Sequence, residues 1–150
     1  MEIRKATFND KKTSLAIARE LKEWFNKEGI KNMKIDFNLN NLVVGIIKNK
    51  VVGFLCYTSY CGKMQLIWLG IKRDIQRKGI SNKFLRWLER EAKRLRLYSI
   101  EVETLPDEDR YEPYKITRDF YYKNGFKRIA YKKARVRGRD DQIVLEKRLI

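Results

Sequence analysis

Apolar residues near the N-terminus recur at helical spacing and then lose their period. Between Asp10 and Asn26 they return every three or four positions, which predicts a helix with one apolar face. Either Asn9 or Asp10 is suited to cap its start, and Gly29 to end it. The stretch 30–41 fits no clean period and predicts a short irregular helix or a loop.

Shorter apolar runs, several of them alternating with polar residues, predict strands. We expect them at residues 2–6, 42–47, 51–58, 64–71, 97–104, 126–132 and 142–149. A helix should follow Ser81 at once and run to about Arg96, and a second should span 116–123 after a long loop at 105–114. The helix between the fourth and fifth strands makes those two strands parallel.

This order of elements, βα(α)βββαβαββ, predicts the fold class. We expect one mixed α/β (α+β) domain over residues 1–150, whose central sheet has about seven mostly antiparallel strands flanked by helices. With 43% hydrophobic and 12% aromatic residues, the chain can bury a real core and is not disordered. No apolar run approaches the roughly 20 residues of a membrane span, and no signal peptide is recognisable, so we expect a cytoplasmic protein.

The counts of histidine and cysteine restrict the chemistry. The chain has no histidine, which excludes every mechanism that depends on one. Its two cysteines, Cys56 and Cys61, cannot complete a four-ligand zinc site, so we expect no metal and interpret both as core thiols.

The charge balance is strongly basic. Thirty-five Lys and Arg against 19 Asp and Glu give a net charge of +16, which suits nucleic acid, an acidic partner or a polyanionic cofactor. A charged fraction of 36% is also typical of a thermophile's surface, although thermal adaptation explains the density of charge and not its sign.

The stretch from Trp68 to Leu88 passes from an apolar strand through a basic turn into an amphipathic helix. Gln76, Gly79 and Ser81 lie in the turn as Q-x-x-G-x-S. Positive side chains accompany them: Arg77, Lys78 and Lys83. Glycine lets the main chain approach an anion, and the first helical turn offers unpaired N–H groups, so the turn is suited to cradle a pyrophosphate. A solvated connection is the alternative interpretation.

Three motifs together resemble the GNAT superfamily of acyl-CoA-dependent N-acyltransferases, and the resemblance covers nearly the whole chain. Ile71 and the turn Gln76–Ser81 match the end of the family's fourth strand and its pyrophosphate loop, [RQ]-x-x-G-x-[GA]. Phe120–Phe126 is similar to its short helix ending in Y-x-x-x-G-F, and Val144–Leu149 to its last strand. The resemblance implies acetyl-CoA as cosubstrate and transfer of its acetyl group directly to a primary amine, in a ternary complex.

The resemblance also implies a set of cofactor-binding residues. They are Leu69, Ile71, Gln76, Arg77, Lys78, Gly79, Ile80, Ser81 and Asn82. Two departures from the family pattern stand out. Ser81 replaces the usual Gly or Ala, although its hydroxyl can itself donate to a phosphate. The R-x-x-N-x-x-A stretch of ribosomal-protein and N-terminal acetyltransferases is missing, so the acceptor amine stays unnamed.

The family match points to Tyr121, four residues before Gly125, as the acid that protonates the departing thiolate. A phenol with an ordinary pKa of about 10 is still protonated at neutral pH, as a general acid must be. The alternative is a core aromatic of an amphipathic helix. Its neighbour Tyr122 is assigned to structure.

An amine with a pKa of about 10.4 is mostly charged at neutral pH and needs a base or a water relay before it can attack. The fourth strand offers no carboxylate, so Glu103 on the fifth strand is the candidate, with Glu101 on the same face. The alternative interpretation is that both are solvated or in salt bridges. Basic residues at 132–139 either flank the acceptor entrance and favour an anionic acceptor, or belong to a solvated loop.

The leading hypothesis is therefore an acetyl-CoA-dependent N-acetyltransferase, acting as a monomer or homodimer on a small molecule or a protein. The alternative is a non-catalytic module of the same fold that binds nucleic acid or the ribosome through its excess positive charge.

Overall fold

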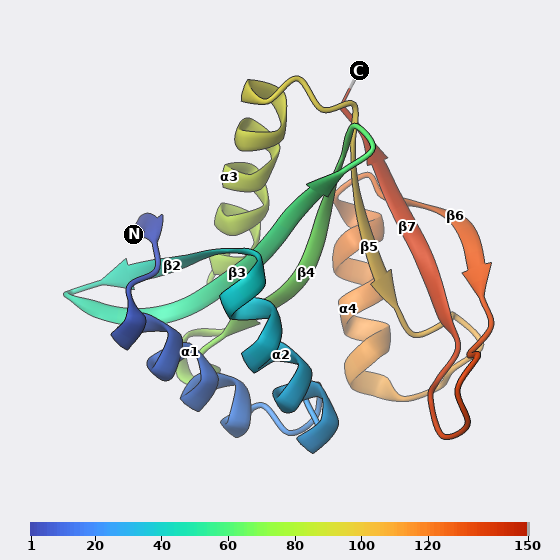
Figure 1. Ribbon diagram of the computed structural model, residues 1–150, viewed down its shortest axis with the longest axis horizontal. Coiled ribbons are helices and arrows are strands. Elements are labelled where there is room, and N and C mark those ends of the chain that lie inside the picture. Colours follow the sequence, from blue (N-terminus) through green and yellow to red (C-terminus); the bar gives the residue numbers. More distant parts are fainter. Residues whose placement is uncertain (150) are drawn as a thin grey trace.

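Seven strands form one sheet, in the order β1-β2-β3-β4-β5-β7-β6, in the computed structural model, which describes residues 1–149 (Figure 1). The elements are β1 (Glu2–Lys5), α1 (Phe8–Glu20), α2 (Lys27–Leu39), β2 (Asn41–Ile47), β3 (Lys50–Tyr60), β4 (Lys63–Ile71), the 3₁₀ turn η1 (Arg73–Ile75), α3 (Ile80–Arg94), β5 (Ser99–Thr104), α4 (Glu112–Lys123), β6 (Lys127–Lys132) and β7 (Gln142–Arg148). Neighbouring strands are antiparallel except β4 and β5, which are parallel. The predicted fold class is confirmed.

The two N-terminal helices differ from the prediction. Thr7 caps α1, because its hydroxyl accepts from the N–H of Asp10 while the Asp10 carboxylate accepts from the N–H of Thr7. The helix ends at Glu20, well before Asn26. Asn26 instead caps a regular helix, α2, through the N–H of Gly29, so Gly29 lies in a first helical turn and does not end a helix.

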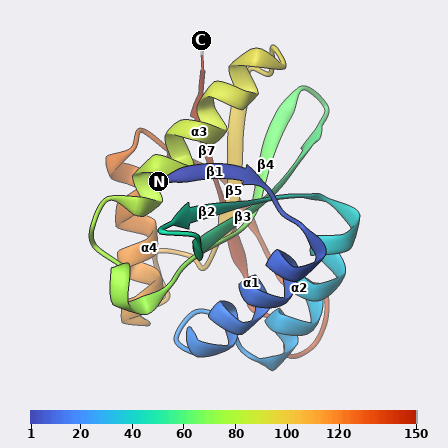
Figure 2. The ribbon, with the colours of Figure 1, turned by 90° about the vertical axis from the view of Figure 1, so that its left-hand side faces the viewer.

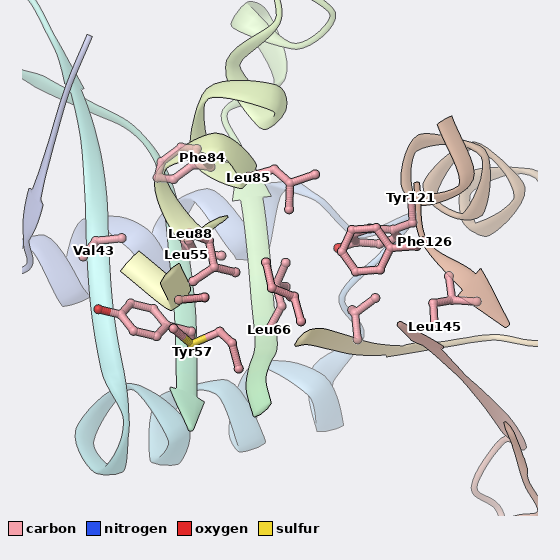
Figure 3. Close-up of a cluster of buried hydrophobic side chains, with 14 of the residues drawn as sticks. Val43, Leu55, Tyr57, Leu66, Phe84, Leu85, Leu88, Tyr121, Phe126 and Leu145 are labelled. Carbon is pink, nitrogen blue, oxygen red and sulfur yellow. The ribbon is translucent and has the colours of Figure 1, made fainter. Parts of the chain in front are cut away.

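Helices cover both faces of the sheet, α1 and α2 on one side and α3 and α4 on the other (Figure 2). Two buried clusters follow from this arrangement. One joins α1 and α2 to β2 and β3, and includes Phe37 and Phe54. The larger one joins α3 and α4 to the middle of the sheet, where Figure 3 shows Phe84, Leu85 and Tyr121. Among residues 1–149, no helix combines the length and apolarity needed to cross a lipid bilayer.

Two smaller expectations are also corrected. The helix α4 begins at Glu112, with Pro113 in its first turn, so the loop before it is shorter than the predicted 105–114. Cys56 is buried as expected, but Cys61 is exposed at the turn between β3 and β4, where its φ is +51°.

The parallel pairing of β4 with β5 stops half-way along β4. It runs from Lys63 opposite Ser99 to Leu66 opposite Val102. The next residue, Ile67, has no partner on β3, because Tyr57 pairs with Leu66 and Cys56 with Trp68. This extra residue is a β-bulge, which bends its strand. Beyond it β4 follows β3 and β5 follows β7, and Figure 1 shows the two strands parting.

Candidate active site

The parted strands open into a cleft with a volume of about 1470 Å³. Its walls come from the segment between α1 and α2, the second half of β4, the end of β5, the start of α3, α4, and the loop between β6 and β7. Segments far apart in the sequence therefore meet where the sheet splits. The cleft exceeds the roughly 300–1,000 Å³ of an ordinary ligand pocket, so it has room for more than one small molecule.

The turn before α3 forms one end of the cleft. The side chain of Gln76 donates a 2.9 Å hydrogen bond to the carbonyl of Ile71 and so ties the turn to the end of β4. Gly79 is the N-cap of α3 with a φ of +77°, and a Cβ placed there would meet no atom within 4 Å. The space beside Gly79 is therefore open to a ligand.

No side chain among the described residues caps α3, so its first N–H groups are left for a ligand. The partial positive charge of the helix N-terminus, with Arg77 beside it, favours an anion. Eight of the nine predicted cofactor-binding residues line the cleft. They are Leu69, Ile71, Gln76, Arg77, Gly79, Ile80, Ser81 and Asn82. Lys78, the ninth, does not line it.

The edge of β4 that faces the cleft has lost its partner strand. Leu69 and Ile71 pair with Leu55 and Gly53 of β3 on their other side. Beyond Leu66 no β5 residue pairs with β4, within residues 1–149. An unpaired strand edge offers backbone N–H and C=O groups, the groups needed to bind an extended amide-containing chain.

Tyr121 lies on α4 and lines the same cleft. Its ring packs between Phe120 and Phe126, with both centroids 5.1 Å away, and only 4% of the residue is exposed. In Figure 3 its hydroxyl points away from Phe126, toward β4. Burial raises the pKa of Tyr121 above its ordinary value, so the phenol holds its proton through neutral pH.

Tyr122 takes the structural position that the sequence assigned to it. It does not line the cleft, and its hydroxyl lies 2.8 and 3.0 Å from the two carboxylate oxygens of Asp107. Asp107 also pairs with Arg128 at 2.9 Å. The two adjacent tyrosines thus differ in environment, one facing the cleft and one fixed in a surface ion-pair network.

The structure separates the two glutamates of β5. Glu103 lines the cleft beyond the split and forms an ion pair with Lys132 of β6. Glu101 lies in the paired half of the strand, where Lys63 contacts it at 2.5 Å and Gln65 at 3.3 Å. Glu101 does not line the cleft, so only Glu103 is placed to act there.

Two residues that line the cleft, and one that supports its wall, were missed in the sequence. Asp36 of α2 accepts a 2.7 Å hydrogen bond from the indole of Trp68, one residue beyond the bulge, and lines the cleft. The buried Arg118 donates to the carbonyls of Leu105 and Asp109 at 3.1 and 3.0 Å and holds the loop before α4. The third is Thr104, which is 4% exposed and lines the cleft with a hydroxyl that has no partner among residues 1–149.

The sequence carried a usable signal for Thr104 but not for Asp36. The stretch Ile30–Asn41 showed no clear helical period, so the direction in which Asp36 points was not predictable. Thr104 continues the alternation of Ile100 and Val102 on the buried face of β5, which was a usable signal.

The basic loop between β6 and β7 contributes unevenly to the cleft. Arg135 and Arg139 line it, whereas Lys133 and Arg137 do not. Arg139 pairs with Glu28 of α2 at 3.3 Å, which offsets its charge.

Within residues 1–149, no group of three or more His, Cys, Asp or Glu side chains could hold a metal ion.

The arrangement combines an anion cradle, an unpaired strand edge, a protonated phenol and a carboxylate around one cleft. This set can hold a phosphorylated, amide-containing carrier, protonate a leaving group and accept a proton from an incoming nucleophile.

Comparisons with known proteins agree with this geometry. The family model described as acetyltransferase (GNAT) domain matches residues 38–128, more than half of the chain. A search of curated proteins finds no significant relative.

Among solved structures, a protein from Desulfovibrio desulfuricans assigned to the GNAT acetyltransferases is similar, with a TM-score of 0.84, 21% identity and 99% of both chains covered. The PaiA N-acetyltransferase from Thermoplasma acidophilum, in complex with coenzyme A, has a TM-score of 0.74 and 22% identity over 98% of both chains. A ribosomal-protein alanine N-acetyltransferase from Escherichia coli has a TM-score of 0.78 and 14% identity over 99% of this chain and 93% of that one.

At such identities the solved structures establish the fold, and the family model establishes the membership. The chain belongs to the GNAT acetyltransferase family.

Proposed function

We propose that this protein transfers an acetyl group from acetyl-CoA directly to a primary amine. The observation that carries the proposal is the split between β4 and β5, which opens one cleft to the start of α3, Tyr121 and Glu103 together. The PaiA N-acetyltransferase of similar fold was solved with coenzyme A, which supports the choice of cosubstrate.

Acetyl-CoA fits the residues at the α3 end of the cleft. The pyrophosphate would lie at the N-terminus of α3, beside Gly79 and Arg77, with N–H groups of Ile80, Ser81 and Asn82 as donors. The pantetheine amides would pair with the open edge of β4 near Leu69 and Ile71. Gln76 would act indirectly, since its amide already holds the turn against Ile71.

In the proposed reaction the amine nitrogen attacks the thioester carbonyl carbon, forming the C–N bond, and the C–S bond then breaks. Tyr121 gives its proton to the departing thiolate. Before the attack Glu103 accepts one proton of the ammonium, through water, because an ammonium cannot attack. The nitrogen loses its second proton as the C–S bond breaks, and this proton returns the Tyr121 phenolate to a phenol through solvent. Lys132, the ion-pair partner of Glu103, would keep that side chain at the cleft wall.

Titration calorimetry with acetyl-CoA, followed by an assay for release of CoA thiol with a panel of amines, tests the proposal. We expect binding by the wild type and a loss of at least about tenfold in affinity in Gly79→Glu, which puts a carboxylate in the cradle. Gly79→Ala is the matched control, because it introduces the same strain at positive φ without the charge. A wild type that binds no acyl-CoA would overturn the proposal.

A second function, binding of nucleic acid, is favoured by one surface feature. A groove of about 450 Å³ on α1 and α2 is lined by Lys11, Lys12, Arg19 and Lys34, with no carboxylate. Phe8, which is 72% exposed, also lines it and could stack on a base. Salt-dependent binding of single-stranded RNA that weakens in Phe8→Ala would support this function, and binding unaffected by that change would argue against it.

A further inference from the structure

The cleft has the opposite charge balance to the rest of the molecule. The protein as a whole carries +16. Six carboxylates nevertheless line the cleft, Glu23, Glu28, Asp36, Glu103, Asp109 and Asp140, against four cationic side chains, Lys22, Arg77, Arg135 and Arg139.

None of the six carboxylates belongs to the turn that forms the anion cradle, although Glu23 is joined to the start of that turn through Arg73 of η1. They come from the segment between α1 and α2, from α2, from β5, from the loop before α4 and from the loop between β6 and β7, whereas the cradle is formed by the turn before α3. The proposed cosubstrate, a polyanion, would occupy the α3 end. The acidic remainder is therefore the part of the cleft that would receive the acceptor.

Half of these carboxylates lack a cationic partner. Arg73, Arg139 and Lys132 pair with Glu23, Glu28 and Glu103, respectively. Within residues 1–149, no ion pair involves the other three, Asp36, Asp109 and Asp140. Asp36 and Asp109 each accept one hydrogen bond, from the Trp68 indole and from the N–H of Tyr111, and their second carboxylate oxygens remain for a ligand.

Aromatic rings stand among the carboxylates and are held in place. The Trp24 indole donates to the carbonyl of Pro113 at 3.1 Å and to Thr117 at 3.2 Å, and the hydroxyl of Tyr114 donates to the carbonyl of Trp24 at 2.6 Å. Tyr111 packs on Tyr114 with centroids 5.9 Å apart. Trp68 is fixed by Asp36. Aromatic faces next to carboxylates are the surroundings that attract ammonium groups.

A buried hydroxyl gives a separate indication that the cleft binds a ligand. Thr104, the residue after Glu103, lines the cleft, and its Oγ1 has no hydrogen-bond partner among the described residues. A buried hydroxyl without a partner is unfavourable in the protein alone. A donor or acceptor on a bound substrate would satisfy it.

We propose that the acceptor is a small molecule with at least two amino groups, one that reacts and one that stays charged. This rests on the proposed function. The reacting nitrogen must become neutral before it attacks, so a carboxylate that serves only that nitrogen gains nothing in the transition state. Unpaired carboxylates on three separate segments, Asp36, Asp109 and Asp140, instead suit positive charges elsewhere on the acceptor.

An anionic acceptor fits these residues poorly. It would have to approach Arg135 and Arg139, and Arg139 is already paired with Glu28. The basic loop between β6 and β7 therefore does not give the acceptor side a net positive charge.

The test measures release of CoA thiol with acetyl-CoA and one amine at a time. The probes are 1,4-diaminobutane, spermidine, the aminoglycoside kanamycin, butylamine with a single amino group, glutamate, and a basic and an acidic peptide. We expect a diamine, spermidine or kanamycin to show a KM at least about tenfold below that of butylamine, because a charge-assisted hydrogen bond is worth about this factor. Spermidine and kanamycin distinguish a linear polyamine from an aminosugar.

Asp36→Asn gives the residue-level test. Asparagine keeps an oxygen for the Trp68 indole and removes only the charge, so the KM ratio of diamine to butylamine should rise about tenfold. Asp119→Asn is the matched control, since Asp119 is an exposed partner of Lys115 on α4 and does not line the cleft. Its ratio should equal that of the wild type.

The outcomes separate the two proposals. Glutamate or either peptide as the preferred acceptor, or an unchanged ratio in Asp36→Asn, would overturn the diamine inference while leaving the N-acetyltransferase intact. Binding of acetyl-CoA with no acceptor among any amine tested would overturn both. Failure to bind acetyl-CoA would overturn the proposed function itself.

Discussion

The hydroxyl of Tyr122 lies 2.8 and 3.0 Å from the two carboxylate oxygens of Asp107, which also binds Arg128. Burial, with the hydrogen bond and charge of Asp107, raises the pKa of Tyr122 to about 12. The preceding tyrosine, Tyr121, has no such partner within residues 1–149 and faces the cleft. Two adjacent phenols therefore allow a matched test of catalysis against structure.

Tyr121→Phe should lower kcat by about 100-fold, the usual effect of a lost general acid, and leave the affinity for acetyl-CoA within about twofold. Tyr122→Phe should leave kcat unchanged and reduce the free energy of unfolding by about 1 kcal/mol through the lost bond to Asp107. Steady-state kinetics, calorimetry and urea unfolding measure these effects. Equal kcat values for the two variants would remove Tyr121 from its proposed role.

The pH dependence of kcat follows from the same burial. A raised pKa keeps the Tyr121 phenol protonated beyond its ordinary value of about 10, so no loss of activity from this group is expected up to that pH. Activity should instead rise with pH over this range, because a larger fraction of an amine with a pKa of about 10.4 becomes neutral. A kcat that falls between pH about 7 and 9, and that no longer falls in Tyr121→Phe, would contradict the raised pKa of Tyr121.

Thr104→Val should increase stability and weaken substrate binding at once. Removing a buried hydroxyl without a partner should raise the free energy of unfolding by about 1 kcal/mol. If the hydroxyl meets a substrate, the KM of that substrate should rise by about threefold or more. Ser99→Ala is the control, because Ser99 is another unpartnered buried hydroxyl of β5 that does not line the cleft. A KM change in both variants would indicate a general effect on the strand.

Arg118→Met should destabilise the protein by about 3 kcal/mol, because Asp107 loses a cationic partner at 3.5 Å and the carbonyls of Leu105 and Asp109 lose their donor. Lys115→Met, one turn earlier on α4 and exposed, should change stability by less than about 0.5 kcal/mol. Urea unfolding measures both. A loss below about 1 kcal/mol in Arg118→Met would mean that the loop before α4 does not depend on this side chain.

Asp10 makes one part of the stability depend on pH. Burial alone would raise its pKa, but hydrogen bonds from Arg4 and Thr7 outweigh it and leave the pKa lowered. A lowered folded-state pKa stabilises the fold above the unfolded value of about 3.9, and this stability is lost as the pH falls through the folded value. Wild type should therefore be more stable than Asp10→Asn at pH about 6, and the difference should shrink below pH about 3. A constant difference across this range would contradict the account.

Predictions from the local pattern of apolar and polar residues succeeded where strands are joined by a tight turn with a recognisable sequence. The hairpin at Lys48 and Asn49 has φ values of +49° and +63°, as a two-residue turn requires, and β2 and β3 flank it as expected. The regular helix α2 was predicted only as a short irregular helix or a loop, because Met33 and Phe37 are its only buried side chains. So narrow an apolar stripe gives little helical periodicity in the sequence.

The sequence by itself determined the order of elements, the parallel step between β4 and β5, the glycine turn before α3, and the tyrosine four residues before Gly125. These depend on spacing and on residue type, which the chain carries locally. Only the tertiary structure decided that β4 bulges at Ile67 and parts from β5, because a bulge depends on the register with the neighbouring strand. Tertiary structure likewise brought Asp36 to Trp68 and placed more carboxylates than cationic side chains around the cleft of a basic chain, since long-range packing sets which charges face a cleft.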